Sequence, residues 1–503
     1  MVRRKSPIKE ESIEATAKRT QELYLAKQYE RLLPHAERLR QMAQAPAYNA
    51  IVLTSYIWSV KAMKTLHHPK LAQTIDAYIG AAKERHHTQH LMQAAQFKLE
   101  HALDHHDYER AIDALEATLL ALGEGTQTLP LLYQIAEIEI ACTHFEAAKR
   151  RLETILSSEQ APASLCTMAY RLLYVMSDVT GDNEHAQRYL DRYFASLDTC
   201  ADDTEEIAEA TLIRADIMAR EGKLYEAKKI RMDLAKQYEA LPQNHEKRLS
   251  NDIQIGELTY YNGQAQQALQ RIKALSDRII TDDPNQISHI SRTLALSRCM
   301  LSLDVVHDIL SPDLCKTRLK AVAVPALPIE AVSEKLFDIQ NRLLHEDFEN
   351  LDEQIEDLQH RCRFANLLVC IPPLDAIFAE YFAKCHDVEK AKHYAKKAQA
   401  GFEHRHDEVS EARVQARLLR LEPQNTSLEQ VLIQKAHIFL ERGHSEIALT
   451  LYLAIAQAEI ERGDDTHAQK MLECALPLIQ TGYMKPKEDK YKMLCEKIAR
   501  HAT

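Results

Sequence analysis

The 503-residue chain is poor in residues that interrupt regular secondary structure, with only 11 Gly and 16 Pro. Aromatic residues make up 6% of it, and Trp58 is the only tryptophan. So few turn-forming residues argue against a β architecture with many tight turns. A hydrophobic content of 46% argues against a disordered chain. The abundant residues, among them Leu, Ala, Glu, Lys and Arg, are good helix formers, so we expect an all-α protein.

The chain also lacks the charge and apolar patterns of nucleic-acid-binding and membrane proteins. Its net charge is −11, and the only basic run of note is Arg3, Arg4 and Lys5, so we expect no direct binding of nucleic acid. No apolar stretch reaches the roughly 18 residues of a membrane span. The ten Cys include no CxxC pair, and the charged first residues lack an apolar signal core. We therefore expect a cytoplasmic protein.

No motif of a known catalytic or cofactor site is present, because GxxxxGK[ST], GxGxxG and GxSxG are all missing. We expect neither enzymatic activity nor a cofactor. One set of histidines leaves a metal site open, since i,i+4 pairs on one face of a helix can share a metal ion. The alternative, which we favour, is a partly solvated polar stripe. If 83–106 is one helix, that face carries His86, His90, His101 and His105.

A short pattern, a Gly followed five residues later by an Ala, recurs along the chain. Gly can end a helix in a left-handed conformation, and the polar residues after it can begin the next helix. A second small residue lies twelve positions before several of these Ala, as Ala136 does before Ala148. The pattern predicts helix pairs packed closely through small residues. Its copies are Gly181–Ala186, Gly222–Ala227, Gly263–Ala268, Gly443–Ala448 and Gly463–Ala468.

This spacing of small residues with Gly between them resembles the tetratricopeptide repeat. The resemblance implies a right-handed α-solenoid of about twelve helical hairpins, closed by a helix over 487–500. Near the end of the chain we expect a first helix over 445–462 and its partner over 465–480. The period is near 40 residues, and such long repeats are similar to those of bacterial maltose-activator-type regulators. The second helices are anchored at Leu32, Ala72, Ala111, Ala148, Ala186, Ala227, Ala268, near Asp308, and at Leu351, Ala391, Val431 and Ala468.

Residues 311–330 interrupt the repeat, because Pro325 and Pro328 cannot continue a helix. One interpretation is a long loop between two hairpins. The other is a hinge between an N-terminal array over 1–310 and a C-terminal array over 331–503, the latter ending in the capping helix.

In tetratricopeptide proteins the first helices line a concave face, which usually holds the ligand. The resemblance implies that the residue after the small position of each first helix points inward. An acidic strip there would favour a basic partner, with Tyr260 and Tyr261 adding aromatic contacts. The alternative is that these are ordinary surface residues of an acidic protein, and Lys61 and Arg420 break the strip at its ends. The inward position holds Glu100, Glu137, Val175, Asp216, Glu257 and Glu380.

Three functions remain open from the sequence. The first is an interaction scaffold or adaptor that binds a protein or peptide in the concave groove. The second is a regulator that senses a peptide or small molecule and acts through a partner protein. The third is a metal-dependent enzyme built on the histidines. We favour the scaffold, and we expect charge reversal at Glu137, Asp216 and Glu257 together to weaken partner binding.

Overall fold

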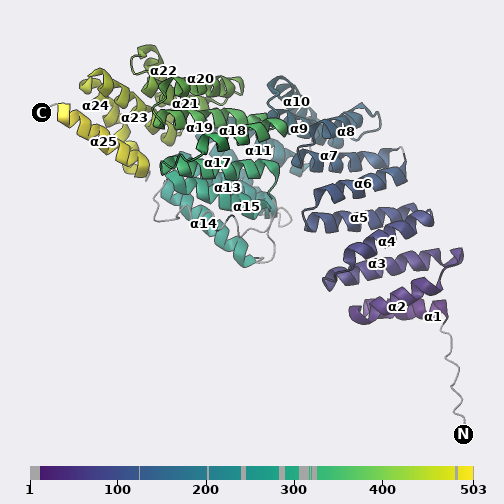
Figure 1. Ribbon diagram of the computed structural model, residues 1–503. Helices are drawn as coiled ribbons and strands as arrows, with labels where there is room; N and C mark the ends of the chain where they lie inside the picture. Colours follow the sequence, from purple (N-terminus) through teal and green to yellow (C-terminus); the bar gives the residue numbers. More distant parts are fainter. Residues whose placement is uncertain are drawn as a thin grey trace, which may run out of the picture. The chain divides into compact units, whose positions relative to one another are not determined.

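A computed structural model describes residues 12–123, 125–200, 203–239, 245–282, 289–304, 317, 319, 326–481 and 485–501. Within these ranges the regular structure is helical throughout, with no strand (Figure 1). The described helices form eleven complete hairpins, one further first helix and a final single helix. The all-α solenoid of helical hairpins expected from the sequence is therefore confirmed.

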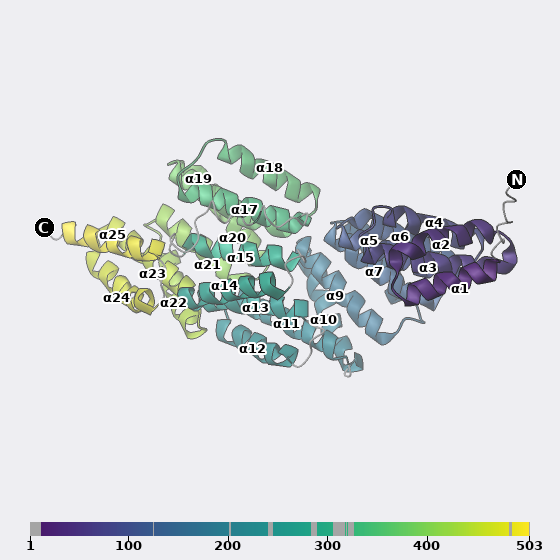
Figure 2. The ribbon, with the colours of Figure 1, turned by 90° about the horizontal axis from the view of Figure 1, so that it is seen from below.

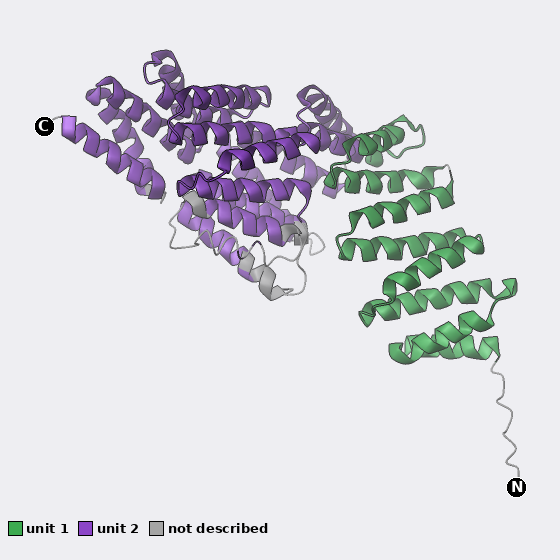
Figure 3. Ribbon diagram, in the orientation of Figure 1, with its two compact units in different colours: residues 1–165 green, residues 166–503 purple. Residues whose placement is uncertain are grey.

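The contacts divide the chain into two compact units, Met1–Leu165 and Cys166–Thr503, called unit 1 and unit 2 below (Figure 3). Unit 1 consists of four hairpins with buried small residues at the helix contacts, such as Ala136 and Ala148. Its helices are α1 (Ile13–Leu25), α2 (Tyr29–Met42), α3 (Asn49–Thr65), α4 (Leu71–Glu84), α5 (Thr88–Asp104), α6 (Tyr108–Leu122), α7 (Leu129–Ala141) and α8 (Phe145–Ser157).

Unit 2 continues the same pattern and ends in α25, which packs against α23 and α24 (Figure 1 and Figure 2). The helices α23 and α24 match the two expected near the end of the chain, and α25 matches the expected cap. The elements are α9 (Ala163–Val179), which begins just before the unit boundary, α10 (Asn183–Ser196), α11 (Thr204–Arg220), α12 (Leu224–Glu239), α13 (His245–Tyr261), α14 (Ala265–Asp282), α15 (His289–Asp304), α17 (Pro328–Leu344), α18 (Leu351–Phe364), α19 (Ile371–Lys384), α20 (Val388–His404), α21 (Glu408–Leu421), α22 (Thr426–Glu441), α23 (Ser445–Arg462), α24 (Asp465–Thr481) and α25 (Lys485–His501).

The boundary between the compact units does not fall at 311–330, where the prolines suggested a break. Most of that segment lies outside the described residues, so its role as a hinge stays a prediction. The helices before and after it, α15 and α17, belong to the same unit and contact each other. Arg292 of α15 forms an ion pair with Glu334 of α17, and Cys299 and Phe337 share a buried cluster.

The turn inside most hairpins contains one residue in the left-handed conformation, five positions before the anchor of the second helix. Gly occupies this position at Gly181, Gly222, Gly263 and Gly463, with φ between 72° and 83°. The same conformation is adopted where the residue is not Gly, so the turn geometry is more regular than the sequence pattern. The non-Gly residues at this position are Lys27, His67, His106, Thr143, Glu346 and His386.

Candidate functional site

A cavity of about 640 Å³ lies inside unit 2, lined by residues of five successive first helices, α13, α15, α17, α19 and α21. Phe402 of α20 completes the wall. One part of the wall is apolar, and the rest carries hydroxyl, amide and charged groups. The apolar part includes Leu296, Met300, Leu336, Ile377, Phe402 and Val414.

The inward position of the repeat lines this cavity in four consecutive first helices. Its residues there are Glu257, Ser297, Gln340 and Glu380. The resemblance predicted Glu257 and Glu380 at this position. It did not single out Ser297 and Gln340, although they lie eleven residues before the expected anchors near Asp308 and at Leu351. Tyr261, one turn beyond Glu257 on α13, also lines the cavity.

The other predicted contact residues lie elsewhere. Tyr260 is 2% exposed and belongs to the hydrophobic core of unit 2, which corrects its expected role as a surface contact. Its neighbour Tyr261 points the other way because successive helical residues face directions about 100° apart. Glu100 and Glu137 lie on α5 and α7 of unit 1, and Asp216 lies on α11 of unit 2.

The acidic residues of the inward position do not form a continuous negative strip. Cations of neighbouring helices pair with three of them, and these cations cannot be found by reading one position of the repeat. The Glu100 carboxylate lies 3.1 Å from Lys64 Nζ, and the Glu380 carboxylate lies 2.7 Å from Arg417 Nη2. Asp216 forms an ion pair with Arg231. The charge that a ligand meets is therefore smaller than the sequence indicated.

Glu257 differs from these three residues in its surroundings. Its carboxylate accepts a hydrogen bond of 2.6 Å from the Ser297 hydroxyl, and within the described part of unit 2 it forms no ion pair with Lys or Arg. Burial raises the pKa of Glu257 and the charge of Asp216 adds to the increase, while the Ser297 hydrogen bond and the charge of Arg231 offset it only in part, so the pKa stays above its usual value. A cationic group of a ligand would stabilise the ionised form that burial disfavours, so this place on the cavity wall favours a cation.

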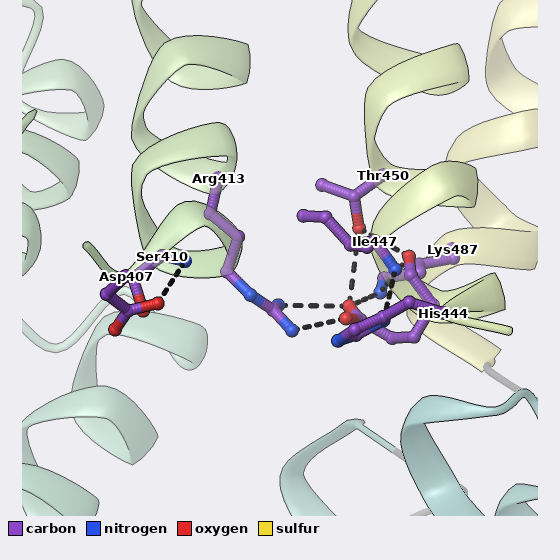
Figure 4. Close-up of polar contacts among 8 residues, drawn as sticks. Asp407, Ser410, Arg413, His444, Ile447, Thr450 and Lys487 are labelled. Carbon is purple, nitrogen blue, oxygen red and sulfur yellow. Dashed lines mark hydrogen bonds and ion pairs between the residues drawn. The ribbon is translucent and has the colours of Figure 1, made fainter. Parts of the chain in front are cut away.

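Arg413 of α21 also lines the cavity. It connects the cavity wall to a buried cluster centred on Glu446, the first acidic residue of α23 (Figure 4). Glu446 is 1% exposed and accepts hydrogen bonds from both terminal nitrogens of Arg413 and from Lys487 of α25. Burial alone would raise the pKa of Glu446, but the charges of Arg413 and Lys487 outweigh it and lower this pKa. The cluster ties α21, α23 and α25 together.

His444 adjoins this cluster and is 1% exposed. Its Nδ1 accepts a hydrogen bond of 3.4 Å from the Ile447 amide, which caps the start of α23. Burial lowers the pKa of His444 to about 3; Glu446 opposes this shift, and Arg413 and Lys487 add to it. The ring is therefore neutral near neutral pH, as its role as a hydrogen-bond acceptor requires.

Sequence reasoning missed Arg413, Glu446 and Lys487 because 33 and 41 residues separate the partners of Glu446 from it. One signal was present. The helix α23 is apolar almost all round, which marks a buried helix, and yet it contains Glu446 and Glu459. A carboxylate in such a helix needs a cation from a neighbouring helix.

The four histidines do not share one helical face. The helix expected over 83–106 is interrupted, because α4 ends at Glu84, His86 is left-handed with a φ of 51°, and α5 begins at Thr88. The Nδ1 atom of His90 lies 2.6 Å from the Tyr78 hydroxyl oxygen. His90 and His101 therefore lie on α5, whereas His86 and His105 lie in the turns before and after it, which corrects the expected single stripe.

Among the described residues, Glu429, Glu459 and His467 are close enough to hold a metal ion. A cation already lies between the two carboxylates, because the Arg462 guanidinium forms ion pairs with both. His467 Nδ1 is 2.6 Å from Glu459. The arrangement is an ion-pair cluster that stabilises the contact between α22, α23 and α24.

No protein-family model matches the chain, and no curated protein matches it. Among solved structures, it is similar to Cut9 in the APC/C hetero-tetramer Cut9-Hcn1, at 11% identity over 94% of this chain and 95% of that chain, with a TM-score of 0.48. It is also similar to a Rap protein complexed with competence and sporulation factor, at 11% identity over 77% and 97% of the two chains, with a TM-score of 0.36. A third is yeast Tom70, at 13% identity over 97% and 96%, with a TM-score of 0.30. These are likenesses of architecture, and the resemblance to maltose-activator-type regulators stays a prediction.

No helix among the described residues combines the length and apolar character needed to cross a membrane.

Proposed function

We propose that the chain is a cytoplasmic binding protein that holds a short peptide segment in the cavity of unit 2. The observation that carries this proposal is the cavity itself, formed by the inward positions of successive first helices. Its volume of about 640 Å³ falls within the range of roughly 300–1,000 Å³ typical of small-ligand sites. A space of this size suits a few residues of a peptide, either free or projecting from a larger protein.

The wall suits a segment that carries both an apolar side chain and one cation. Leu296, Met300 and Phe402 offer apolar surface, and Glu257 offers a carboxylate to a lysine, an arginine or an amino terminus. The acidic strip led us to expect a basic partner. The cavity requires less of the ligand, namely one cationic group beside Glu257. Recognition is by complementarity of shape and charge, and the proposal assigns no catalytic step.

A second candidate, the sensing regulator, is favoured by the way unit 2 closes on itself. The side chains of Arg442 and Asn262 donate hydrogen bonds of 2.7 and 2.9 Å to the carbonyls of Glu221 and Gly443. Asn183 likewise donates to the carbonyl of His404. We call this line of contacts the seam. A ligand that changes the angles between successive first helices would strain the seam. A partner protein could then bind the changed shape of unit 2.

Selection of a random peptide library on the full chain tests the proposal. We expect enriched peptides to contain Lys or Arg beside apolar residues, and Glu257→Gln to weaken their binding about 10–100-fold, since a charge-assisted contact contributes about 1.5–3 kcal/mol. Glu496→Gln on the exposed face of α25 is the matched control and should leave the affinity unchanged. Peptides that bind wild type and Glu257→Gln equally would contradict the assigned role of Glu257.

A further inference from the structure

A second cavity of unit 2, of about 300 Å³, lies beside the Asn183 contact of the seam, and we call it the seam cavity. It is lined by different residues from the cavity that contains Glu257. Its wall comes from α9, α10 and α11 on one side and from the turn between α20 and α21 on the other. One part of this wall is apolar, and the rest is polar and includes two cations. The apolar part includes Ala186, Leu190 and Ile217, and the cations are Arg220 and Arg405.

One carboxylate, that of Asp178, serves both arginines of the seam cavity. The Arg220 Nη1 atom lies 3.0 Å from Asp178 Oδ1, and the Arg405 Nη2 atom lies 3.6 Å from Asp178 Oδ2. Within the described part of unit 2, neither arginine forms an ion pair with another acid. The other carboxylate on the wall, that of Glu221, lies 2.6 Å from Lys223 Nζ and is paired with it. The wall therefore carries one more guanidinium charge than its free carboxylate balances.

Arg405 is the arginine whose polar contacts are less complete. Its Nη1 atom donates a hydrogen bond of 3.1 Å to the Val369 carbonyl, but its distance from Asp178 exceeds the roughly 2.7–2.9 Å of a charge-assisted hydrogen bond. Its Nε atom is buried and has no hydrogen-bond partner among the described residues. Arg220, by contrast, donates to Asp178 at 3.0 Å and to the Tyr174 hydroxyl at 3.2 Å. An oxyanion from a ligand would stabilise the Arg405 guanidinium, whose side chain is only 12% exposed.

We propose that the seam cavity binds a small ligand with an oxyanion at one end and a short apolar body at the other. The oxyanion, a carboxylate or a phosphate, lies against Arg220 and Arg405, because the planar guanidinium matches the geometry of both groups. The apolar body packs against Leu190 and Ile217, which removes its surface from water. The volume of about 300 Å³ is at the lower end of the range for small-ligand sites, so the body has only a few carbon atoms.

Isothermal titration of the full chain with isocaproate and, separately, with isoamyl phosphate tests the proposal. The two probes share one branched apolar body and distinguish a carboxylate from a phosphate as the source of the oxyanion. We expect one saturable site per chain for at least one of them. Isocaproamide, which keeps the shape without the charge, should bind at least tenfold more weakly. Failure of both charged probes, or binding of the amide within tenfold of the better charged probe, overturns the proposal.

Two substitutions with opposite expected effects locate the oxyanion. Arg405→Gln should weaken binding of the better probe at least tenfold, as the loss of a charge-assisted contact does. Asp178→Asn removes the carboxylate that competes with the ligand for both arginines and should strengthen binding severalfold, a gain that misfolding cannot produce. Arg188→Gln, at an exposed position of α10 outside the cavity, is the matched control and should bind as wild type does. Wild-type affinity in Arg405→Gln, or no gain in Asp178→Asn, would overturn the assignment.

The two arginines also lie on opposite sides of the seam. Arg220 belongs to α11, whereas Arg405 follows His404, whose carbonyl accepts the hydrogen bond from Asn183. An oxyanion held by both guanidiniums connects the two sides, so the bound probe should slow amide hydrogen exchange around the turn between α20 and α21. Unchanged exchange in this turn at a saturating probe concentration would place the probe elsewhere and contradict the proposal.

Discussion

At the scale of single residues, the packing of unit 2 depends on a carboxylate buried inside an apolar helix. Glu446 is stabilised only because Arg413 and Lys487 reach it from two other helices. Removing one partner of a buried ion pair leaves the others uncompensated, at a cost of about 3–5 kcal/mol.

The first prediction follows from this cluster. Glu446→Gln should lower the free energy of unfolding of unit 2 by about 3–5 kcal/mol, because Arg413 and Lys487 would keep their charges without a counter-ion. Urea denaturation followed by circular dichroism measures the change. Glu496→Gln, whose exposed carboxylate lies 3.5 Å from Arg500 in an i,i+4 pair, is the control and should have little effect. Equal effects of the two substitutions would contradict the role of Glu446.

The second prediction concerns pH. The folded-state pKa of His444 is lowered to about 3, so below about pH 6.5 the unfolded chain binds a proton that the folded chain does not. Stability from this residue is therefore complete above pH 6.5 and is lost on acidification by about 1.4 kcal/mol per pH unit. Between pH 6 and 4.5, wild type should lose stability faster than His444→Asn, which keeps a capping side chain. Parallel pH profiles of the two proteins would show that His444 titrates normally.

At the scale of elements, the hairpin turns share one left-handed residue whether or not that residue is Gly. Thr143 adopts a φ of 66° at the position where other hairpins have Gly, a conformation that is unusual for a β-branched residue. Gly463 adopts a φ of 83° with open space around the place a Cβ would take. The two positions therefore isolate the backbone preference from packing.

The third prediction uses this pair. Thr143→Gly should raise the free energy of unfolding by about 1 kcal/mol, because Gly relieves the left-handed strain, and Gly463→Ala should lower it by about the same amount. Thermal unfolding of the full chain measures both shifts. Shifts of the same sign would mean that side-chain contacts, rather than the left-handed backbone, decide the stability of these turns.

The helices and their period could be predicted from the sequence because each hairpin repeats one local rule, a small residue facing a small residue across a turn. The resemblance to the tetratricopeptide repeat predicted that Glu257 and Glu380 face inward. The local rule failed at His86, because a left-handed turn without Gly leaves no mark in the sequence. It also could not show that Lys64, Arg231 and Arg417 neutralise the acidic residues, since those cations come from neighbouring helices.

At the scale of the whole molecule, the decisive feature lies within unit 2, where hairpin turns far apart in the chain meet along the seam. Small rotations between successive hairpins accumulate until α11 contacts α21 and α13 contacts α23. No local sequence pattern encodes these accumulated rotations, so the cavity could not be predicted from the sequence. Gly222 allows the contact, because a Cβ there would meet the ring of Phe439.

The fourth prediction tests the seam. Gly222→Val should loosen it and increase amide hydrogen exchange in α12 and α22, because the added side chain collides with Phe439. Gly463→Val is the matched control, since it imposes the same left-handed strain with no neighbour to meet. Exchange confined to the substituted turn in both variants would show that the seam does not depend on this close approach.

The measurement that tests the central claim most directly is peptide binding by a variant with its cavity filled. Ala376 lies on the cavity wall, and Ala400 is exposed on α20, a second helix. If the cavity is the binding site, Ala376→Trp should reduce the affinity for peptides selected on wild type at least tenfold in isothermal titration, while Ala400→Trp binds them as wild type does. Peptides that bind Ala376→Trp with unchanged affinity would contradict the account, because they would have to bind outside the cavity.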